Sequence, residues 1–274
     1  MSPPAASGAD DALAASRVAA GIAERAGTLL LRYFRDETLT SDWKPDYSIV
    51  TEADVAADRL IASELATHFP SDAILSEELA PTSAIATSSP AEHTWVVDPL
   101  DGTTNFSLGV QHWGVSIARC DARGPDVGVL FFPALGELYV ASRSGGATMN
   151  GARIHVRAPS ASRLVGMLAC CARTPRLYHV NLPMKVRVFG SAAYTLACVA
   201  RGSAAIGMET RPKLWDLAAG WCLVEEAGGV VATLDGSSPF PLVADRAYAE
   251  RSFPLLAAAS VELAEQAREH IEAR

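Results

Sequence analysis

Acidic residues stand at several points where an apolar stretch of this sequence gives way to a turn or a helix. A carboxylate at the end of a strand costs free energy unless water, a cation or a hydrogen-bond donor compensates it. Because oxygen ligands without nearby His or Cys suit hard cations, the pattern indicates a magnesium or manganese site. The residues are Glu77 and Glu78 after AILS, Asp98 and Asp101 after TWVV, Asp216 after KLW, and Asp54 near a helix start.

The run WVVDPLDGTTNF, residues 95–106, has the spacing of a metal and phosphate site. The proline between the two aspartates fixes φ and bends the chain as it leaves the strand. The carboxylates of Asp98 and Asp101 and the carbonyl of Leu100 can then converge on adjacent ions. Gly102 permits a tight turn, so that its amide and that of Thr103 can face a phosphate. Two ions roughly 4 Å apart would hold that phosphate, activate a water and stabilise the departing oxygen.

Each of these features, taken alone, also has a purely structural interpretation. A DG pair after a strand is commonly a turn. Asp54 lies three residues after Thr51, where an acidic residue pairs with a helix N-terminus and favours its dipole. Asp216 can do the same for a later helix, Glu77-Glu78 can be a solvated pair, and Gly190-Ser191 can be a helix cap. The occurrence of all these features in one chain, in this order, decides between the structural and the chemical interpretation.

In combination, the segments resemble the inositol monophosphatase family of metal-dependent phosphatases. The resemblance runs from about Lys44 to Gly229, and the D-P-x-D-G-T run followed by W-D-x-A-A-G is highly specific. The matching segments are KPDYSIVTEAD, ILSEE, WVVDPLDGTTNF, GVSIA, GATMNG, VFGSAAYTLACVARG and WDLAAG.

The resemblance implies a role for each matching metal ligand. Glu77 would bind the first ion and help to orient the nucleophilic water. Asp98 would bridge two ions, and the Leu100 carbonyl would complete the first site. Asp101 and Asp216 would hold the second ion.

Residues that act on the water and the phosphate are also implied by the resemblance. Asp54 would accept a hydrogen bond from the Thr103 hydroxyl, which would polarise the attacking water. The amides of Gly102, Thr103 and Thr104 would bind the phosphate. Lys44 would belong to an active-site loop.

A third group of matching residues is expected to contact the hydroxyl-bearing part of the substrate. It consists of Gly190, Ser191, Ala192 and Glu209, together with Asp101. Glu209 stands seven residues before the WDLAAG aspartate, as in family members that act on inositol phosphates. The alternative for Glu209 is a surface charge at the end of a strand.

The implied activity is magnesium-dependent hydrolysis of a small phosphate monoester by a metal-activated water, without a covalent phosphoenzyme. Two or three Mg²⁺ ions are expected, with Mn²⁺ as a substitute, and lithium should inhibit. Inositol monophosphate or a similar polyol phosphate is the first expected substrate, and histidinol phosphate is the second. Fructose 1,6-bisphosphate and adenosine 3',5'-bisphosphate follow. A hypothesis of another class is an interaction module with vestigial activity.

Composition narrows the classes of protein that fit. The 274 residues are 49% apolar and 20% charged, which is typical of a globular protein with a sizeable core. The net charge of −8, without a long basic run, disfavours nucleic-acid binding. The five cysteines form no CxxC pair and the six histidines lack zinc spacing, so we expect buried free thiols and no zinc site. Because the sequence has neither a signal-like start nor an apolar run long enough to cross a membrane, we expect a cytoplasmic protein. The family resemblance also implies a homodimer.

The elements that must position these residues form an α+β fold. We expect a layered αβαβα sandwich of the sugar-phosphatase type, with the metal site between two lobes. Residues 1–9 are expected to be disordered, 10–157 to form an N-terminal α+β lobe with most metal ligands, and 158–274 a C-terminal α/β lobe. Apolar periodicity predicts helices over 10–34, from Thr51 to Pro70, and over the final segment 261–274. Short apolar runs predict strands between 73 and 142, and the Asn150-Gly151 pair predicts a hairpin.

Overall fold

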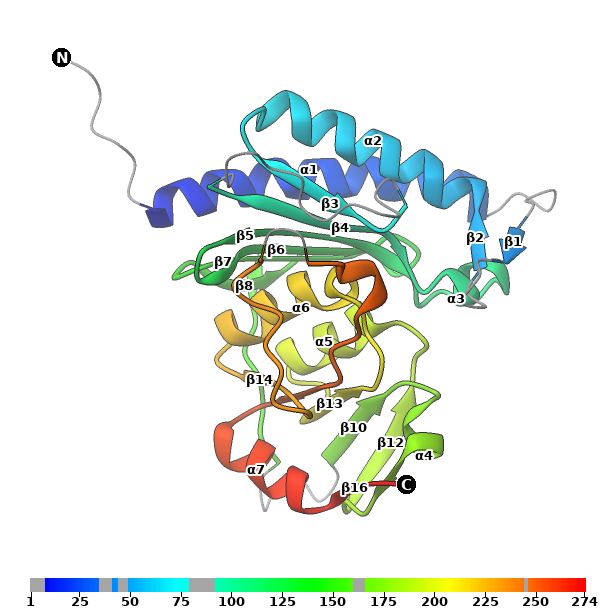
Figure 1. The fold of residues 1–274 in the computed structure, drawn as a ribbon, viewed down its shortest axis with the longest axis vertical. Coiled ribbons are helices and arrows are strands. Elements are labelled where there is room, and N and C mark those ends of the chain that lie inside the picture. The colour runs from blue at the N-terminus through cyan, green and yellow to red at the C-terminus, as the bar shows by residue number, and fades with distance from the viewer. Residues whose placement is uncertain (1–7, 35–40, 44–48, 79–91, 160–165, 244–245) are drawn as a thin grey trace.

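The computed structural model describes residues 8–34, 41–43, 49–78, 92–159, 166–243 and 246–274. Figure 1 shows a stack of alternating helical and sheet layers, in which two helices cover the upper face of a seven-stranded sheet. Two further helices lie between that sheet and a five-stranded one, and a last helix covers the outer side of the second sheet. The predicted αβαβα sandwich is confirmed.

The first sheet and its outer helices are built from residues before 154. The sheet has the order β3-β4-β5-β6-β7-β8-β9 and is antiparallel except for the β3–β4 pair. Its elements, with a separate β1–β2 pair, are α1 (Gly8–Phe34), β1 (Ser41–Trp43), β2 (Ile49–Thr51), α2 (Glu52–His68), β3 (Ala73–Ser76), β4 (Thr94–Asp101), α3 (Thr103–Ser107), β5 (Gly114–Asp121), β6 (Gly124–Phe132), β7 (Glu137–Ser142), β8 (Gly146–Met149) and β9 (Ala152–Arg153).

The second sheet has the order β12-β10-β13-β15-β14 and is mixed. Strands β12, β10 and β13 run parallel, whereas β15 is antiparallel to both of its neighbours. The elements of this half are β10 (Gly166–Cys170), α4 (Thr174–Leu177), β11 (Tyr178–Val180), β12 (Met184–Val188), α5 (Ala192–Ala200), β13 (Ile206–Glu209), α6 (Leu214–Glu226), β14 (Val230–Thr233), η1 (Tyr248–Glu250), β15 (Leu255–Ala258), α7 (Val261–Glu269) and β16 (Ile271–Ala273).

The alternation of side chains between the two faces of each strand explains the layers. On β4, Trp95 and Val97 pack in the cluster under α1 and α2, while Val96 between them packs in the cluster around α5 and α6. On β10, Ala169 faces the same central cluster, and its neighbours Leu168 and Cys170 face the cluster that includes α7. Because successive side chains of a strand point to opposite faces, a strand that is apolar throughout is covered on both sides.

Two glycines let α6 lie close to its neighbours in the central layer. A Cβ on Gly220 would lie 2.6 Å from the Cβ of Leu196, so this position must be small where α6 crosses α5. A Cβ on Gly128 of β6 would lie 2.4 Å from the Ala219 carbonyl oxygen. The final glycine of the WDLAAG segment therefore has a packing role against α5, and Gly128 allows the same helix to lie close to the first sheet.

Most predicted elements are confirmed, with differences at the chain ends. The first helix begins at Gly8, within the range expected to be disordered, and residues 1–7 lie outside the described part. The expected final helix ends at Glu269, because residues 271–273 form β16 and pair with β11. The predicted hairpin is confirmed: Asn150 (φ 49°) and Gly151 (φ 79°) both adopt the positive φ of a type I′ turn. The two-lobe division at residue 157 stays an interpretation.

Candidate metal and phosphate site

A bulge in β4 places two of the predicted ligands on one face of the first sheet. Asp98 lies opposite Ser116 and Asp101 opposite Gly114, so three steps along β4 match two along β5. In a regular strand, residues three apart point to opposite faces, and the extra residue of a bulge brings them to the same side. The D-P-L-D spacing thus directs both carboxylates toward the central helices, as the sequence predicted.

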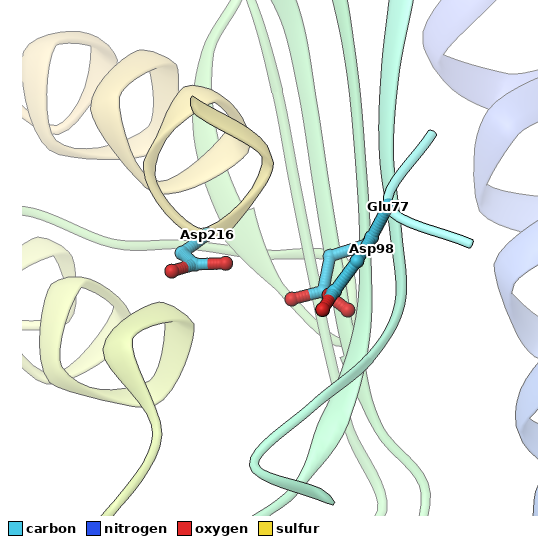
Figure 2. A group of neighbouring side chains, drawn as sticks. All are labelled: Glu77, Asp98 and Asp216. Atoms are coloured by element: carbon cyan, nitrogen blue, oxygen red, sulfur yellow. The ribbon is translucent and has the colours of Figure 1, made fainter. Parts of the chain in front are cut away.

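Three carboxylates from both halves of the chain converge in front of β4. Figure 2 shows Glu77, which follows β3, beside Asp98 of β4, with Asp216 of α6 facing them. One oxygen of each lies within 4.8 Å of one oxygen of each of the others. Ser116 donates a hydrogen bond of 3.0 Å to the Trp215 carbonyl and so ties β5 to the start of α6. The predicted ligands Glu77, Asp98 and Asp216 are therefore brought together.

Backbone amides hold two of these side chains in place. The Leu100 amide donates to Oδ1 of Asp98 at 2.9 Å, and the Lys213 amide donates to Oδ2 of Asp216 at 2.8 Å. In the second contact, the side chain in the first turn of α6 accepts from the amide of the N-cap residue, so it caps this helix. The structural interpretation of Asp216 and the metal interpretation are thus both compatible with its position.

Burial and mutual repulsion act on the carboxylates of this group. Burial, followed by the charges of Glu77, Asp101 and Asp216, raises the pKa of Asp98 well above its ordinary value. Burial and the charges of Glu77 and Asp101 likewise raise the pKa of Asp216. Like charges that share a buried space are costly unless a proton or a cation compensates them. An all-oxygen donor set of this kind fits a hard divalent cation such as Mg²⁺.

Asp101 lies at the N-terminus of α5. It accepts a hydrogen bond from the Ser191 hydroxyl and bonds from the amides of Ala192 (3.2 Å) and Ala193 (3.0 Å). Burial raises its pKa to about 6, although these three donors oppose the shift. Asp101 thus holds the predicted substrate-contact segment against β4, and it is not part of the three-carboxylate group. Ser191 also caps α5 by accepting from the Tyr194 amide at 3.0 Å.

The Thr103 hydroxyl lies between two predicted site residues. It is 3.2 Å from Oδ1 of Asp54, which is buried near the start of α2, and 3.0 Å from the Leu100 carbonyl oxygen. Gly102 precedes α3 in the left-handed region (φ 86°), where a Cβ would lie 2.8 Å from the His112 carbonyl oxygen. The local geometry thus requires glycine at this position and brings the expected Asp54–Thr103 pair together.

Asn105 is a structural residue of the motif to which the sequence analysis gave no role. Its Nδ2 donates to the carbonyl oxygens of His112 (2.6 Å) and Phe189 (2.7 Å). Gly190 (φ 74°) approaches so closely that a Cβ there would lie 2.9 Å from Oδ1 of Asn105. Asn105 therefore joins the DGTTNF turn to the segment before α5. A polar side chain directly after a turn motif was the available signal.

A cavity of about 610 Å³ extends from Asp216 along the C-terminal edge of the second sheet. Thr104, Gly190, Ser191, Ala192 and Glu209 all line it, so the structure gathers these predicted contact residues at one place. A larger cavity of about 940 Å³ beside Arg119 contains none of the predicted site residues. The smaller cavity is the one that adjoins the carboxylates.

Glu209 is 5% exposed, which rules out the alternative of a surface charge. Burial, followed by the nearby Cys171, raises its pKa well above the ordinary value, and its Oε1 has no hydrogen-bond partner among the described residues. A buried carboxyl oxygen without a partner at a cavity wall is suited to accept a hydrogen bond from a ligand. Cys171 itself is half-buried, whereas the other four cysteines are buried as expected, and all five are free thiols.

Two other sequence expectations concern Lys44 and membrane-spanning helices. Lys44 lies outside the described residues. Within the described part of the chain, no helix has both the length and the apolar character needed to cross a bilayer.

Comparison with known proteins identifies the family. The family model described as the inositol monophosphatase family matches residues 14–272. The inositol-1-monophosphatase of Mesorhizobium japonicum is 37% identical over 228 residues, with 78% of this chain and 83% of that protein covered. The histidinol-phosphatase of Chlorobaculum parvum is 37% identical over 227 residues, with the same coverage of 78% and 83%.

A third relative and a solved structure extend the comparison. The Nus factor SuhB of Xylella fastidiosa is 36% identical over 230 residues, covering 78% of this chain and 80% of that protein. The crystal structure of the extragenic suppressor protein suhB from Bartonella henselae superimposes with a TM-score of 0.78 at 29% identity, covering 94% of this chain and 98% of that one. The carboxylate geometry, the fold and the relatives agree, and the chain belongs to the inositol monophosphatase family of metal-dependent phosphatases.

Proposed function

We propose that this protein hydrolyses small phosphate monoesters with Mg²⁺, and that inositol monophosphate or a similar polyol phosphate is its substrate. The observation that carries the proposal is the convergence of Glu77, Asp98 and Asp216, whose ligand oxygens lie within 4.8 Å of one another beside a ligand-sized cavity. Carboxylates from three separate elements meet there at a high electrostatic cost, which a bound cation would offset.

The three carboxylates would hold Mg²⁺, with Mn²⁺ as a substitute; the Leu100 carbonyl would complete the first ion's site, and Asp101 would hold a second ion together with Asp216. Two or three ions are proposed in all. When bound, such ions supply positive charge for the phosphate oxygens and lower the pKa of water. Inhibition by lithium is part of the same proposal.

Two residues are proposed to orient the attacking water. The Thr103 hydroxyl has Asp54 and the Leu100 carbonyl as hydrogen-bond acceptors, so its single proton points into the protein. Its oxygen can then accept a hydrogen bond from a water on the cavity side. In this arrangement Asp54 positions Thr103, and Glu77 would accept the proton that the water loses as its oxygen attacks phosphorus. The ester P–O bond would break in the same step without a covalent intermediate, and the departing oxygen would take up a proton from solvent.

Phosphate and polyol would occupy neighbouring parts of the site. The amides of Gly102, Thr103 and Thr104 are proposed to bind phosphate oxygens at the turn before α3. Asp101, Glu209 and the segment from Gly190 to Ala192 are proposed to contact substrate hydroxyls, which carboxylates recognise as hydrogen-bond donors. Lys44 is proposed to belong to an adjacent loop.

The names of two relatives suggest alternative functions, which the same assays distinguish. One is named a histidinol-phosphatase, which supports histidinol phosphate as a second candidate substrate. Another is named a Nus factor, which supports a role in macromolecular interaction. The buried carboxylate group favours the enzyme, since an interaction module has no need to gather these charges. A homodimer in the cytoplasm completes the proposal, and the five free thiols support a reducing compartment.

The test is a hydrolysis panel run with Mg²⁺ and with EDTA. It compares p-nitrophenyl phosphate, inositol 1-phosphate, histidinol phosphate, fructose 1,6-bisphosphate and adenosine 3',5'-bisphosphate. We expect magnesium-dependent release of phosphate, with inositol 1-phosphate preferred to histidinol phosphate. Absence of magnesium-dependent turnover across the whole panel would refute the proposed enzymatic activity and favour the alternative role in macromolecular interaction.

A further inference from the structure

Three arginines line the same cavity as Asp216 and Glu209. Arg173 and Arg176 belong to the segment after β10, and Arg211 belongs to the segment between β13 and α6. From these side chains we infer that, among polyol and sugar phosphates, the preferred substrate carries a second anionic group, a phosphate or a carboxylate, bound by the arginines. The inference rests on the proposed function, because it names the substrate class of the same site.

Sheet topology explains why the arginines meet. Strands β12, β10 and β13 run parallel, with Cys170 paired to both Val188 and Met208, so their C-terminal ends lie at one edge. The segments that leave this edge carry the cavity wall, with Arg173 after β10 and Arg211 after β13. Ligands of open α/β sheets bind outside the carboxyl ends of parallel strands, so the position is one at which a ligand is expected.

The two arginine-bearing segments are fixed to each other. Sγ of Cys171 lies 3.4 Å from Oγ1 of Thr174 and 3.2 Å from Oγ1 of Thr210, so one thiol connects the residues beside Arg173 to the residue before Arg211. The Arg173 carbonyl accepts from the Arg176 amide at 3.0 Å, which closes the turn between these two arginines. Their backbones are therefore held in place while the guanidinium groups reach solvent.

Charge makes the three arginines unusual in this protein. The chain has a net charge of −8, and the adjacent end of the cavity is acidic. In the part of the chain that the structure describes, no carboxylate lies within 4.0 Å of any of the three guanidinium groups. Two arginines elsewhere in the protein differ in this respect, because Arg119 pairs with Asp126 and Arg201 pairs with Glu137. Guanidinium groups without an internal partner at a ligand cavity are suited to bind phosphate or carboxylate from outside.

The size of the cavity agrees with such a substrate. About 610 Å³ is well within the range of small-molecule sites and leaves space beyond a single phosphate ester group. Its lining includes both Asp216 of the metal-binding group and the three arginines. Cationic substrates would be disfavoured there by like charge, which ranks a polyol or sugar phosphate with a second anion above amine-bearing histidinol phosphate.

The experiment measures a selectivity ratio. For wild type, kcat/KM is determined for fructose 1,6-bisphosphate and for 6-phosphogluconate, each relative to inositol 1-phosphate, in the presence of Mg²⁺. The two probes distinguish a second phosphate from a carboxylate. We expect at least one ratio to exceed about tenfold, as charge-assisted hydrogen bonds to a bound anion imply. The triple variant Arg173→Gln, Arg176→Gln, Arg211→Gln should lose that preference through a higher KM.

The matched control is Arg187→Gln, which removes the same charge from an exposed position on β12 that does not line the cavity. It should retain the wild-type ratio. Equal ratios for wild type and triple variant, or the same loss in the Arg187 control, would overturn the inference. If inositol 1-phosphate and p-nitrophenyl phosphate are hydrolysed without any preference for a second anion, this inference fails and the proposed function stands. No turnover of any ester refutes both.

Discussion

Two parts of the site are built in opposite ways: the carboxylates around β4, here called the metal end, and the three cavity arginines, here called the arginine end. At the metal end, Asp98 and Asp101 are almost fully buried on a bulged strand, and backbone amides fix their oxygens. At the arginine end, Arg173 and Arg211 are exposed on short connecting segments after parallel strands. Reaction chemistry requires exact placement of charge, whereas recognition of a remote group tolerates longer and more mobile side chains. Changes at the metal end should therefore alter turnover, and changes at the arginine end should alter the choice of substrate.

The largest expected effect is at the centre of the metal end. Asp98→Asn keeps the volume of the side chain but removes the charge shared with Glu77 and Asp216. We expect a loss of kcat of about 10³-fold or more, as for removal of a principal electrostatic group. Circular dichroism and thermal unfolding should show a folded protein, since the substitution relieves repulsion between carboxylates. Turnover close to that of wild type would contradict the assignment of Asp98 as a ligand.

A smaller loss is expected where the water is proposed to be oriented. Thr103→Val removes the hydroxyl that lies 3.2 Å from Asp54 and preserves the shape of the side chain. We expect kcat to fall by about 10²-fold, the typical contribution of a positioned proton-transfer group. Thr103→Ser is the matched control and should recover most of the activity. If Val and Ser variants have the same kcat, the hydroxyl has no part in the reaction.

Stability of the metal-free protein should depend on pH through Asp101. Burial raises its pKa from 3.8 to about 6. Between these values the folded state binds more protons than the unfolded state, so this stabilisation is complete below pH 3.8 and is lost as the pH rises through about 6. Urea unfolding in EDTA should show a loss of about 1.4 kcal/mol between pH 5 and pH 7.5, because about one pKa unit of the shift falls in this range and each unit corresponds to about 1.4 kcal/mol.

Asp101→Asn tests that assignment. The variant should lack this part of the pH dependence, while Mg²⁺ should reduce the dependence in the wild type by stabilising the charged form. An unchanged pH profile in the Asn variant would show that the other carboxylates control the stability.

Glu209 is proposed to contact the substrate hydroxyls, and its substitution should have the smallest effect. Glu209→Gln should raise KM for inositol 1-phosphate by about tenfold, as expected when one hydrogen bond to a hydroxyl is weakened. Hydrolysis of p-nitrophenyl phosphate, which lacks polyol hydroxyls, serves as the comparison substrate and should be affected much less. An equal loss for both esters would indicate that Glu209 acts at the metal end and not through the substrate hydroxyls.

The sequence was sufficient to predict what depends on local chemistry. Proline and glycine in DPLDG predict a change of direction, and Asn150-Gly151 predicts a type I′ turn, because each constrains φ within a few residues. The order of predicted helices and strands indicated an α+β fold, and its αβαβα layering was the expectation for the sugar-phosphatase type. The grouping of Glu77, Asp98 and Asp216 could be expected from the family resemblance, although residues 77 and 216 come from opposite halves.

Long-range pairing and exposed positions could not be predicted in this way. Residues 271–273 continue a helical pattern in sequence, but they pair with residues 178–180, more than 90 positions earlier. The strand at 184–188 was missed although Met, Lys, Val, Arg and Val alternate there. Arg173 and Arg211 are 38 positions apart in sequence, and only the parallel pairing of β10 and β13 brings them to one cavity.

The central helical layer has a consequence for folding cooperativity. Leu130 and Phe132 of the first sheet share one buried cluster with Leu196 of α5, Leu217 of α6 and Leu255 of the second sheet. A chain cut near residue 157 would leave one face of the first sheet without its cover and expose that cluster to water. The halves therefore cannot melt independently, and equilibrium unfolding should be a single transition in which the active site is lost together with the core.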